Sequence, residues 1–202
     1  MPKLPRAFYL NDTVSVARAL LGCVLWHRNG DELLAARIVE TEAYLGANDM
    51  ASHARRGIRT PRNESMYLEG GHAYVYLSYG MHWCMNVVTQ EEGLAEAVLL
   101  RAAEPVEGVE FMRERRPKAK HDHELMNGPG KMCEAMGIDK RRDGTSLKSD
   151  VLWLAPRDRP VDDSDIAVSK RIGVDNCGDA AHWPLRFFIR GHRHVSRYRY
   201  ER

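Results

Sequence analysis

Alternating apolar and polar residues mark several segments of this chain as β-strands. The run from Leu33 to Tyr44 follows a strand-like segment at residues 23–27, and Asn29-Gly30 between the two is a strong hairpin signal. Further apolar runs typical of strands occupy residues 73–77, 81–88, 97–102 and 185–189. Because neighbouring strands of this kind pair as hairpins, the sequence predicts an α+β fold with a mostly antiparallel sheet, not a repeated βαβ unit.

Three other segments carry the signals of helices. Residues 13–21 have an apolar stripe that begins after the N-cap candidate Asp12, and residues 108–116 and 130–136 are also helix-like. Residues 45–71, in contrast, contain few apolar residues and many Gly, Asn, Arg and Pro. This composition is typical of a long loop that carries function.

The bulk composition is that of a soluble globular protein with one domain spanning residues 1–202. Hydrophobic residues make up 44% and charged residues 29% of the chain, which is long enough to bury a substantial core. No apolar stretch approaches the roughly 18 residues of a membrane span, and no signal peptide is evident. The four cysteines are scattered and form no Cys-x-x-Cys pair, which favours reduced thiols in the cytoplasm.

The charge of the chain is near neutral overall but unevenly distributed. A formal charge of +2 and a pI of about 8.4 fall short of the pI above about 9 that marks dedicated nucleic-acid binders. Basic residues nevertheless gather in three places: Arg55 to Arg62, Arg113 to Lys120, and Arg190 to Arg202. Any one cluster is equally consistent with a solvated surface, whereas three of them suggest a basic side that suits a polyanionic partner.

Two carboxylates and several tyrosines provide the candidate chemistry. Side chains two apart on a strand share a face, so Glu40, Glu42 and Tyr44 are expected on one side, and Tyr74 and Tyr76 on one side of another strand. A carboxylate among aromatic rings can hold a flat base and activate a water beside it. A structural salt bridge is the alternative for a carboxylate on an apolar strand, since burial without a partner is costly.

The spacing of the carboxylates argues against a glycosidase pair. Glu40 and Glu42 are about 7 Å apart along one strand, whereas the two carboxyl groups of glycosidases flank the scissile bond from opposite sides. Glu40 is therefore assigned a structural role. Arg101 ends a buried apolar run and is expected to pair with Glu42 or Glu104.

Metal and cofactor motifs are weak. The pairs His121-Asp122-His123 and His192-Arg193-His194 have no second half at ligand spacing in the sequence, so neither predicts a zinc site. The zinc deaminase signature and the dinucleotide-binding glycine motif are absent, and no cofactor is expected. Gly128-Pro129-Gly130-Lys131 is not a Walker A loop, but it can offer a helix N-terminus and a lysine to a phosphate.

Eight short motifs, spread over nearly the whole chain, occur together in one order. They are Ile38-Val39-Glu40-Thr41-Glu42-Ala43-Tyr44-Leu45-Gly46, Thr60-Pro61-Arg62-Asn63, Tyr74-Val75-Tyr76, Tyr79-Gly80-Met81, Cys84-Met85-Asn86, Leu99-Leu100-Arg101-Ala102, Gly128-Pro129-Gly130-Lys131 and Arg171-Ile172-Gly173-Val174. With these motifs the chain resembles the alkyladenine (3-methyladenine) DNA glycosylase family. The resemblance implies a mixed α/β domain around a curved antiparallel sheet flanked by helices.

The resemblance also implies a reaction. Such enzymes are monofunctional: they flip a damaged purine out of duplex DNA and hydrolyse its N-glycosidic bond with water. Glu42 would be the general base, and Arg101 and the backbone carbonyl of Ile172 would also hold the water. The implied lesions are 3-methyladenine, 7-methylguanine, hypoxanthine and ethenoadenine, removed in base excision repair.

The remaining roles follow by matching position. Tyr44 and Tyr76 would sandwich the flipped base, His53 would add a wall and a hydrogen-bond donor, and Asn86 would crowd the exocyclic amino group of guanine. Tyr74 is left as a packing residue.

Contacts to the duplex are the second group of implied roles. Tyr79 would fill the gap left in the duplex, with Met81 beside it, since exposed apolar side chains at a turn can enter a base step. Arg55, Arg59 and Lys131 are candidates for phosphate contacts.

The expected partner is double-stranded DNA with damaged purines, bound by a monomer without a membrane. The short N-terminal segment lacks the long extension of animal relatives and indicates a bacterial, cytoplasmic protein. Two other readings remain open. One is a non-catalytic nucleic-acid-binding domain that uses the aromatic residues for stacking. The other is a hydrolase of free nucleosides, in which the exposed wedge residues and basic clusters would be idle.

Overall fold

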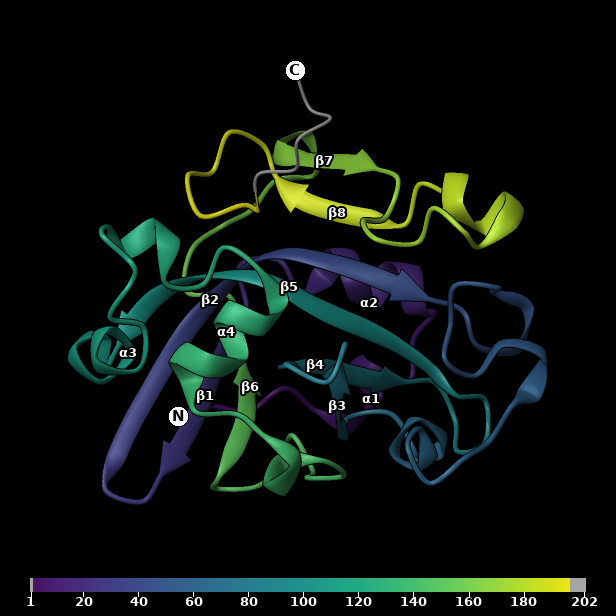
Figure 1. Ribbon diagram of the computed structural model, residues 1–202, viewed down its shortest axis with the longest axis horizontal. Helices are drawn as coiled ribbons and strands as arrows, with labels where there is room; N and C mark the ends of the chain where they lie inside the picture. The colour runs from purple at the N-terminus through teal and green to yellow at the C-terminus, as the bar shows by residue number, and fades with distance from the viewer. Residues whose placement is uncertain (1, 197–202) are drawn as a thin grey trace.

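The computed structural model describes residues 2–196 and is organised around two long strands, β2 (Glu32–Tyr44) and β5 (Glu96–Glu107), which cross the molecule side by side (Figure 1). Among the described residues the sheet has eight strands, and every pairing in it is antiparallel. The strand order is β3 (Ala73–Ser78), β4 (His82–Thr89), β5, β2, β1 (Val24–Asn29) and β6 (Leu152–Ala155). The predicted α+β class and antiparallel sheet are therefore confirmed.

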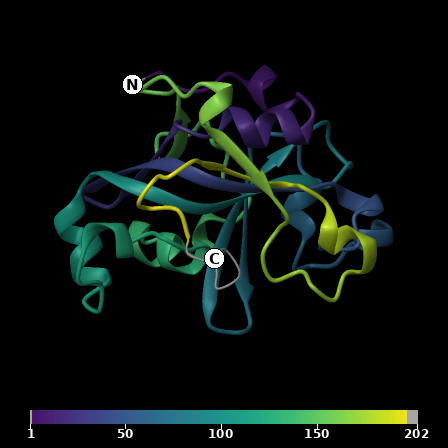
Figure 2. The same ribbon diagram turned by 90° about the horizontal axis from the view of Figure 1, so that it is seen from above.

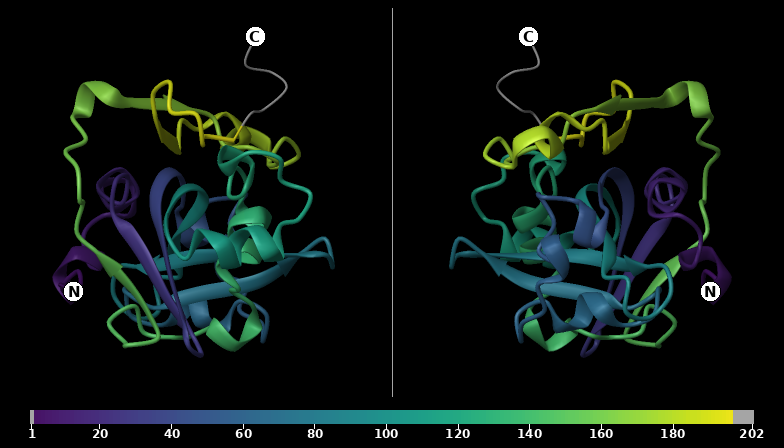
Figure 3. Two further views of the ribbon diagram at one scale, coloured as in Figure 1. Left: turned by 90° about the vertical axis from the view of Figure 1, so that its left-hand side faces the viewer. Right: turned by 90° about the vertical axis from the view of Figure 1, so that its right-hand side faces the viewer.

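Strand β2 has different partners along its length. Its first half pairs with β1 through the predicted Asn29-Gly30 turn, and its residues Glu40, Thr41 and Glu42 pair with β8 (Arg186–Ile189). β8 in turn pairs with β7 (Ile166–Ser169), so this pair extends over the second half of β2 (Figures 1 and 3). The register between β2 and β5 shifts on both sides of Glu40, and such irregularities bend a strand and increase its twist. The sheet consequently curls into a half-barrel.

Helices lie on both sides of the β2–β5 pair. In Figure 2, α2 (Thr13–Ala19) lies on one side of these strands, and α3 (Val109–Arg115) and α4 (Pro129–Met136) lie on the other. Asp12 caps α2 as expected, accepting the Ser15 N–H at 3.0 Å. The short helix α1 (Arg6–Tyr9) was not predicted from the sequence.

The main core is apolar and lies between the sheet and these helices. Leu34, Ile38 and Leu100 of the sheet pack there with Met112 of α3 and Met132 of α4, all fully buried. Large aliphatic and thioether side chains of this kind each contribute roughly 1.5–3 kcal/mol on burial. This core fixes the backbones of β2 and β5, from which the polar residues of the site project.

A second, smaller core anchors the segment predicted as a long loop. Residues 45–71 contain three short 3₁₀ helices: η1 (Gly46–Asn48), η2 (Arg55–Gly57) and η3 (Glu64–Tyr67). Their Ala54, Met66 and Tyr67 pack against Tyr74 of β3 and Val88 of β4. The segment is thus a packed wall along one side of the sheet.

No helix among the described residues is long and apolar enough to cross a membrane. Of the basic cluster at the C-terminal end, Arg197, Arg199 and Arg202 lie outside the described residues.

Candidate active site

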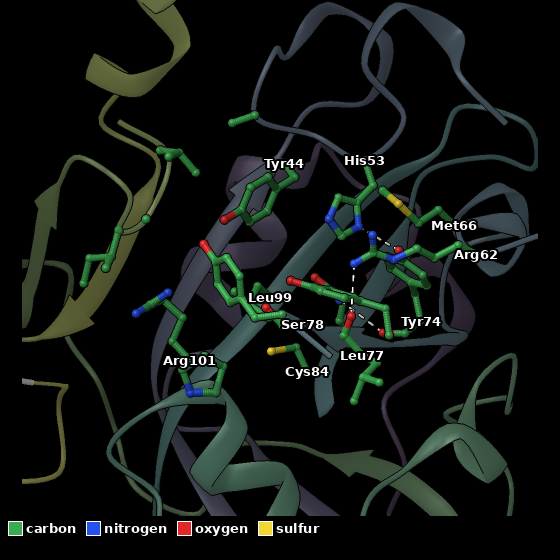
Figure 4. Close-up of a pocket in the computed structure, with 18 of the residues that line it drawn as sticks. Tyr44, His53, Arg62, Met66, Tyr74, Leu77, Ser78, Cys84, Leu99 and Arg101 are labelled. Atoms are coloured by element: carbon green, nitrogen blue, oxygen red, sulfur yellow. Dashed lines mark hydrogen bonds between the residues drawn. The ribbon is translucent and has the colours of Figure 1, made fainter. Parts of the chain in front are cut away.

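A cavity of about 600 Å³ opens between β3, β5, the 51–66 segment and the 172–177 segment (Figure 4). Its volume lies within the usual range of small-molecule sites, about 300–1,000 Å³. The structure brings seven of the sequence-predicted residues into its lining: Tyr44, His53, Tyr76, Tyr79, Asn86, Arg101 and Ile172. Four of them come from the strands β2, β3, β4 and β5, one from the turn between β3 and β4, and two from connecting segments that are far apart in the sequence.

Glu42 lies directly behind this lining and is fully buried. Its Oε1 accepts the N–H of Ile172 at 2.8 Å, and its Oε2 accepts the Tyr44 hydroxyl at 2.9 Å and the Arg101 guanidinium at 3.3 Å. All three donors line the cavity. The contact from Ile172 to Glu42 is made by its N–H, and the role that the resemblance implies for its carbonyl, to hold a water, stays a prediction.

A second carboxylate, Glu40, lies two residues before Glu42 on β2 and is also fully buried. Its Oε1 accepts the Nε–H groups of Arg101 at 3.0 Å and Arg186 at 2.7 Å. Burial opposes ionisation, yet these two guanidinium groups, together with Ser196, hold the pKa of Glu40 below its usual value. Arg101 therefore bridges both carboxylates.

Of the two partners predicted for Arg101, the structure confirms Glu42 and excludes Glu104. Glu104 stands opposite Arg37 in the register of β2 and β5, and the two form an ion pair there. Arg101 lies next to the register shift, where its guanidinium reaches Glu40 and Glu42. The local irregularity of the strands, which the sequence does not mark, decides the partner.

Tyr44 is fixed from behind by a residue that had no assigned role. The Arg171 guanidinium lies 4.7 Å from the Tyr44 ring centroid, within cation–π range. Arg171 is buried and ion-paired with Asp49, and it also donates to the backbone carbonyls of Ala43 and Ala180. Burial, followed by the nearby Glu42, raises the pKa of Tyr44, so its phenol remains protonated and can donate.

On the opposite wall, Tyr76, Tyr74 and His53 form an aromatic group. The Tyr76 ring stacks on Tyr74 at 5.3 Å between centroids, and His53 meets Tyr76 edge-on at 4.5 Å. The Tyr74 hydroxyl lies 2.8 Å from Nδ1 of His53. Tyr74 is buried, as a packing residue should be, but it also orients His53, a role that the sequence did not indicate.

His53 is neutral at physiological pH. Burial, reinforced by Arg62 and Arg55, lowers its pKa to about 4. Arg62 lines the cavity as well: it donates to the Leu77 carbonyl at 3.0 Å, and its guanidinium lies 5.5 Å from the Tyr76 ring centroid (Figure 4). Arg62 occurred in a recognised motif but had no assigned role.

Asn86 lines the cavity next to Tyr74 of this aromatic group. Its side chain is buried, and its Nδ2 donates to the Tyr74 carbonyl at 3.1 Å across the β3–β4 pair. This bond fixes the orientation of the amide within the lining of the cavity.

The β3–β4 hairpin projects from the body of the molecule next to the cavity (Figure 2). At its tip Tyr79 is 85% exposed and Met81 is 71% exposed, the two most exposed large apolar side chains of the described chain. Tyr79 has a φ of 49°, which is uncommon for a residue with a side chain. Exposed apolar residues on such a projection are typical of a contact surface.

The three candidate phosphate-contacting residues differ in their surroundings. Arg55 and Lys131 are exposed, and Lys131 donates to Asn127 at 2.8 Å. Arg59 is also exposed, but it is ion-paired with Glu64 and lies over the Tyr67 ring. Their contact with phosphate remains a prediction.

The two His-x-His motifs, unconnected in sequence, meet in space. The rings of His123 and His194 are 6.5 Å apart, and those of His192 and His194 are 5.4 Å apart. Among residues 2–196, however, no group of three or more His, Cys, Asp or Glu side chains has a geometry that could hold a metal ion.

Comparison with known proteins shows the family of this chain. The family described as "Methylpurine-DNA glycosylase (MPG)" matches residues 7–193. Relatives from Bdellovibrio bacteriovorus (46% identical over 96% of this chain and 98% of theirs), Methanocella arvoryzae (47%; 98% and 97%) and Desulfitobacterium hafniense (45%; 97% and 99%) each bear the name "Putative 3-methyladenine DNA glycosylase". The resemblance noted from the motifs is confirmed, and the chain belongs to the methylpurine-DNA glycosylase family of DNA-repair enzymes.

Proposed function

We propose that this enzyme flips damaged purines out of duplex DNA and hydrolyses their N-glycosidic bonds with a water activated by Glu42. The observation that carries the proposal is the buried Glu42 carboxylate, held by three donors that all line a cavity large enough for a base. A carboxylate this close to a nucleic-acid site would repel phosphate, so a pure binding domain has no use for it.

The proposed reaction balances as a simple hydrolysis. Glu42 takes a proton from the water as the water oxygen bonds to C1′, and the purine leaves with the electron pair of the broken C1′–N bond. A cationic alkylated purine leaves as a neutral base, whereas a neutral purine such as hypoxanthine must also gain a proton as it leaves. Arg101 and the backbone carbonyl of Ile172 would also hold the water, and Arg101 offsets the charge of the carboxylate. No lysine lines the cavity of the described chain, so a Schiff-base lyase step is not expected.

The base would be held between Tyr44 and Tyr76. Arg171 supports the Tyr44 ring, and Tyr74 stacks against Tyr76, so neither wall needs to be ordered upon binding. Stacking offsets the few kcal/mol that flipping costs. Tyrosine faces also attract cationic alkylated purines, which are good leaving groups.

The neutral His53 would supply a donor to the base. Burial raises the pKa of Tyr74, so its phenol keeps its proton and can donate to Nδ1 of His53. The hydrogen of the imidazole then resides on Nε2, free to bond an acceptor of the base. This tautomer is part of the proposal.

The decisive experiment compares three substrates. We expect release of 3-methyladenine from alkylated duplex DNA and of hypoxanthine from an inosine-containing duplex, with no release of base from free inosine. Turnover of free inosine at a comparable rate would favour a nucleoside hydrolase. Binding to the duplex without any release of base would favour a non-catalytic domain.

Asn86 would exclude undamaged guanine by crowding its exocyclic amino group. Replacing Asn86 by Ser removes part of the side chain, and we expect release of guanine from undamaged duplex to rise roughly tenfold, the scale of a small steric contact. The release of hypoxanthine, which lacks that amino group, serves as the internal control. An unaltered rate for guanine would refute this role.

Tyr79 would stand in the gap left by the flipped nucleotide. We expect Tyr79→Ser to weaken binding to a duplex with an abasic site roughly tenfold, because loss of stacking on a base is worth about 1–3 kcal/mol. Val168→Ser, at another exposed apolar position on β7, provides the matched control. Equal affinities of the Tyr79 variant and the unchanged enzyme would count against the wedge.

The finer features of the partner are proposals as well. The lesions are expected to be 3-methyladenine, 7-methylguanine, hypoxanthine and ethenoadenine in double-stranded DNA. Arg55, Arg59 and Lys131 are candidates for contacts with its phosphates, which would make affinity fall with salt concentration. The enzyme is expected to act as a monomer in the bacterial cytoplasm.

A further inference from the structure

Ser196, at the C-terminal end of the described chain, reaches the interior of the molecule at Glu40. Its hydroxyl donates to Oε1 of Glu40 at 2.7 Å, and its backbone N–H donates to Oε2 at 2.8 Å. Glu40 is fully buried and Ser196 is 7% exposed. One residue thus satisfies both oxygens of a carboxylate that lies 156 positions earlier in the chain.

Arg186 of β8 joins the same group. Its Nε–H donates to Oε1 of Glu40 at 2.7 Å, and its terminal nitrogens bond the Ser169 hydroxyl at 3.1 Å and the Ser196 carbonyl at 3.4 Å. Arg186 therefore binds both the Glu40 carboxylate and the backbone of Ser196. A buried charge held this way is oriented as well as neutralised.

The group is connected to the proposed catalytic carboxylate through Arg101. Its Nε–H bonds Glu40 at 3.0 Å, while another nitrogen of the same planar guanidinium bonds Glu42 at 3.3 Å. Because the guanidinium is rigid, the position of Glu40 sets how Arg101 presents itself to Glu42 and to the cavity. Within the described part of the chain, the Glu40 and Glu42 carboxylates are paired with the guanidinium groups of Arg101 and Arg186.

We infer that Ser196 is a positioning residue for base excision, which fixes Glu40 and, through Arg101, the carboxylate of Glu42. This inference rests on the proposed function, since it needs Glu42 to activate the water. The positive charge of Arg101 is thereby shared between Glu40 and Glu42, so that Arg101 is not paired with Glu42 alone. The segment after β8 becomes part of the machinery of the site, although it does not line the cavity.

Loss of the Ser196 hydroxyl should have a pH-dependent effect. Among residues 2–196, the charged groups next to Glu40 are Arg101 from β5 and Arg186 from β8, with Glu42 two residues along its own strand. Burial disfavours the charged form of Glu40, whereas the two arginines and both donors of Ser196 lower its pKa. Without the hydroxyl, Glu40 takes up a proton at higher pH. Arg101 then pairs with Glu42 alone, so the arrangement that positions the Glu42 carboxylate is lost at a higher pH than in the unchanged enzyme.

The test is single-turnover release of hypoxanthine from duplex DNA, measured against pH at saturating enzyme. We expect Ser196→Ala to lower the rate about tenfold, the scale of one hydrogen bond to a charged group, and to move the acid limb of the pH profile upward. Binding to abasic-site duplex should stay within twofold. Ser196→Thr, which keeps the hydroxyl, should have the rate of the unchanged enzyme. Ser196→Cys, with a weak donor of similar size, should have a rate between those of the unchanged enzyme and Ser196→Ala.

Ser169→Ala is the matched control, because it removes a hydroxyl from the same Arg186 without touching Glu40. Its rate and pH profile should remain within twofold of the unchanged enzyme. Unchanged rates for both Ser196→Ala and Ser196→Cys, or an equal loss in Ser169→Ala, would overturn the inference. If Glu42→Gln kept full excision, the proposed function itself would fail. If the Ser196 variants excised at the unchanged rate while Glu42→Gln was inactive, only the positioning role of Ser196 would be refuted.

Discussion

Glu42→Gln is expected to abolish excision while leaving the binding of lesion-containing duplex nearly intact. The glutamine has the same shape and can still accept the Ile172 N–H, but it cannot take a proton from water. General-base catalysis is worth about 10²–10⁴-fold, so the single-turnover rate should fall by roughly a thousandfold. The measurement is release of hypoxanthine from duplex DNA with enzyme in excess.

Glu104→Gln supplies the matched control for this experiment. Glu104 is also a strand glutamate paired with an arginine, but its partner is Arg37 and it does not line the cavity. Its rate should stay within a few-fold of the unchanged enzyme. Full single-turnover excision by the Glu42 variant would remove Glu42 from the role of base.

Arg171→Met should destabilise the whole protein more than most single substitutions. The pair Arg171–Asp49 is fully buried, and removing the guanidinium leaves Asp49 as an uncompensated charge. Breaking such a pair costs about 3–5 kcal/mol of the free energy of unfolding. Urea unfolding followed by circular dichroism measures the change directly. Excision should also fall at temperatures where the variant remains folded, since Tyr44 loses the support of its ring.

An exposed ion pair provides the comparison. Arg141 also pairs with an aspartate, Asp139, but the arginine side chain is 70% exposed. Arg141→Met should therefore leave the free energy of unfolding nearly unchanged, because solvent screens an exposed ion pair. If the two substitutions lowered the free energy of unfolding equally, burial of the Arg171–Asp49 pair would not be the reason for the destabilisation.

Local patterns along the chain were sufficient for the main elements of the sheet. The Asn29-Gly30 turn and the long apolar runs predicted β1, β2 and β5 because alternation and turn chemistry depend only on neighbouring residues. The strands β6 and β7 were missed, since each has only four residues and needs its partners to form. The wall made by residues 45–71 was also taken for a loop, because its 3₁₀ helices are held by tertiary packing.

The residues of the candidate site divide in the same way. Their chemical types and order in the sequence were enough to select Glu42, Tyr44, Tyr76 and Asn86, and the cavity contains or adjoins all of them. Of the supporting residues, Arg171 begins one of the eight motifs but had no assigned role, and Ser196 gave no signal at all. An arginine or serine near the end of a chain looks like any surface residue until the fold buries it.

By itself, the sequence determined the antiparallel α+β framework, the family and the candidate residues for the chemistry, because short-range pattern and motif order encode these. Only the tertiary structure decided which charges meet. A register shift beside Glu40 turns Arg101 toward two carboxylates and away from Glu104. The pairing of β8 with β2 then brings Arg186 and Ser196 onto Glu40. Contacts between residues more than a hundred positions apart depend on the whole fold, and no local pattern specifies them.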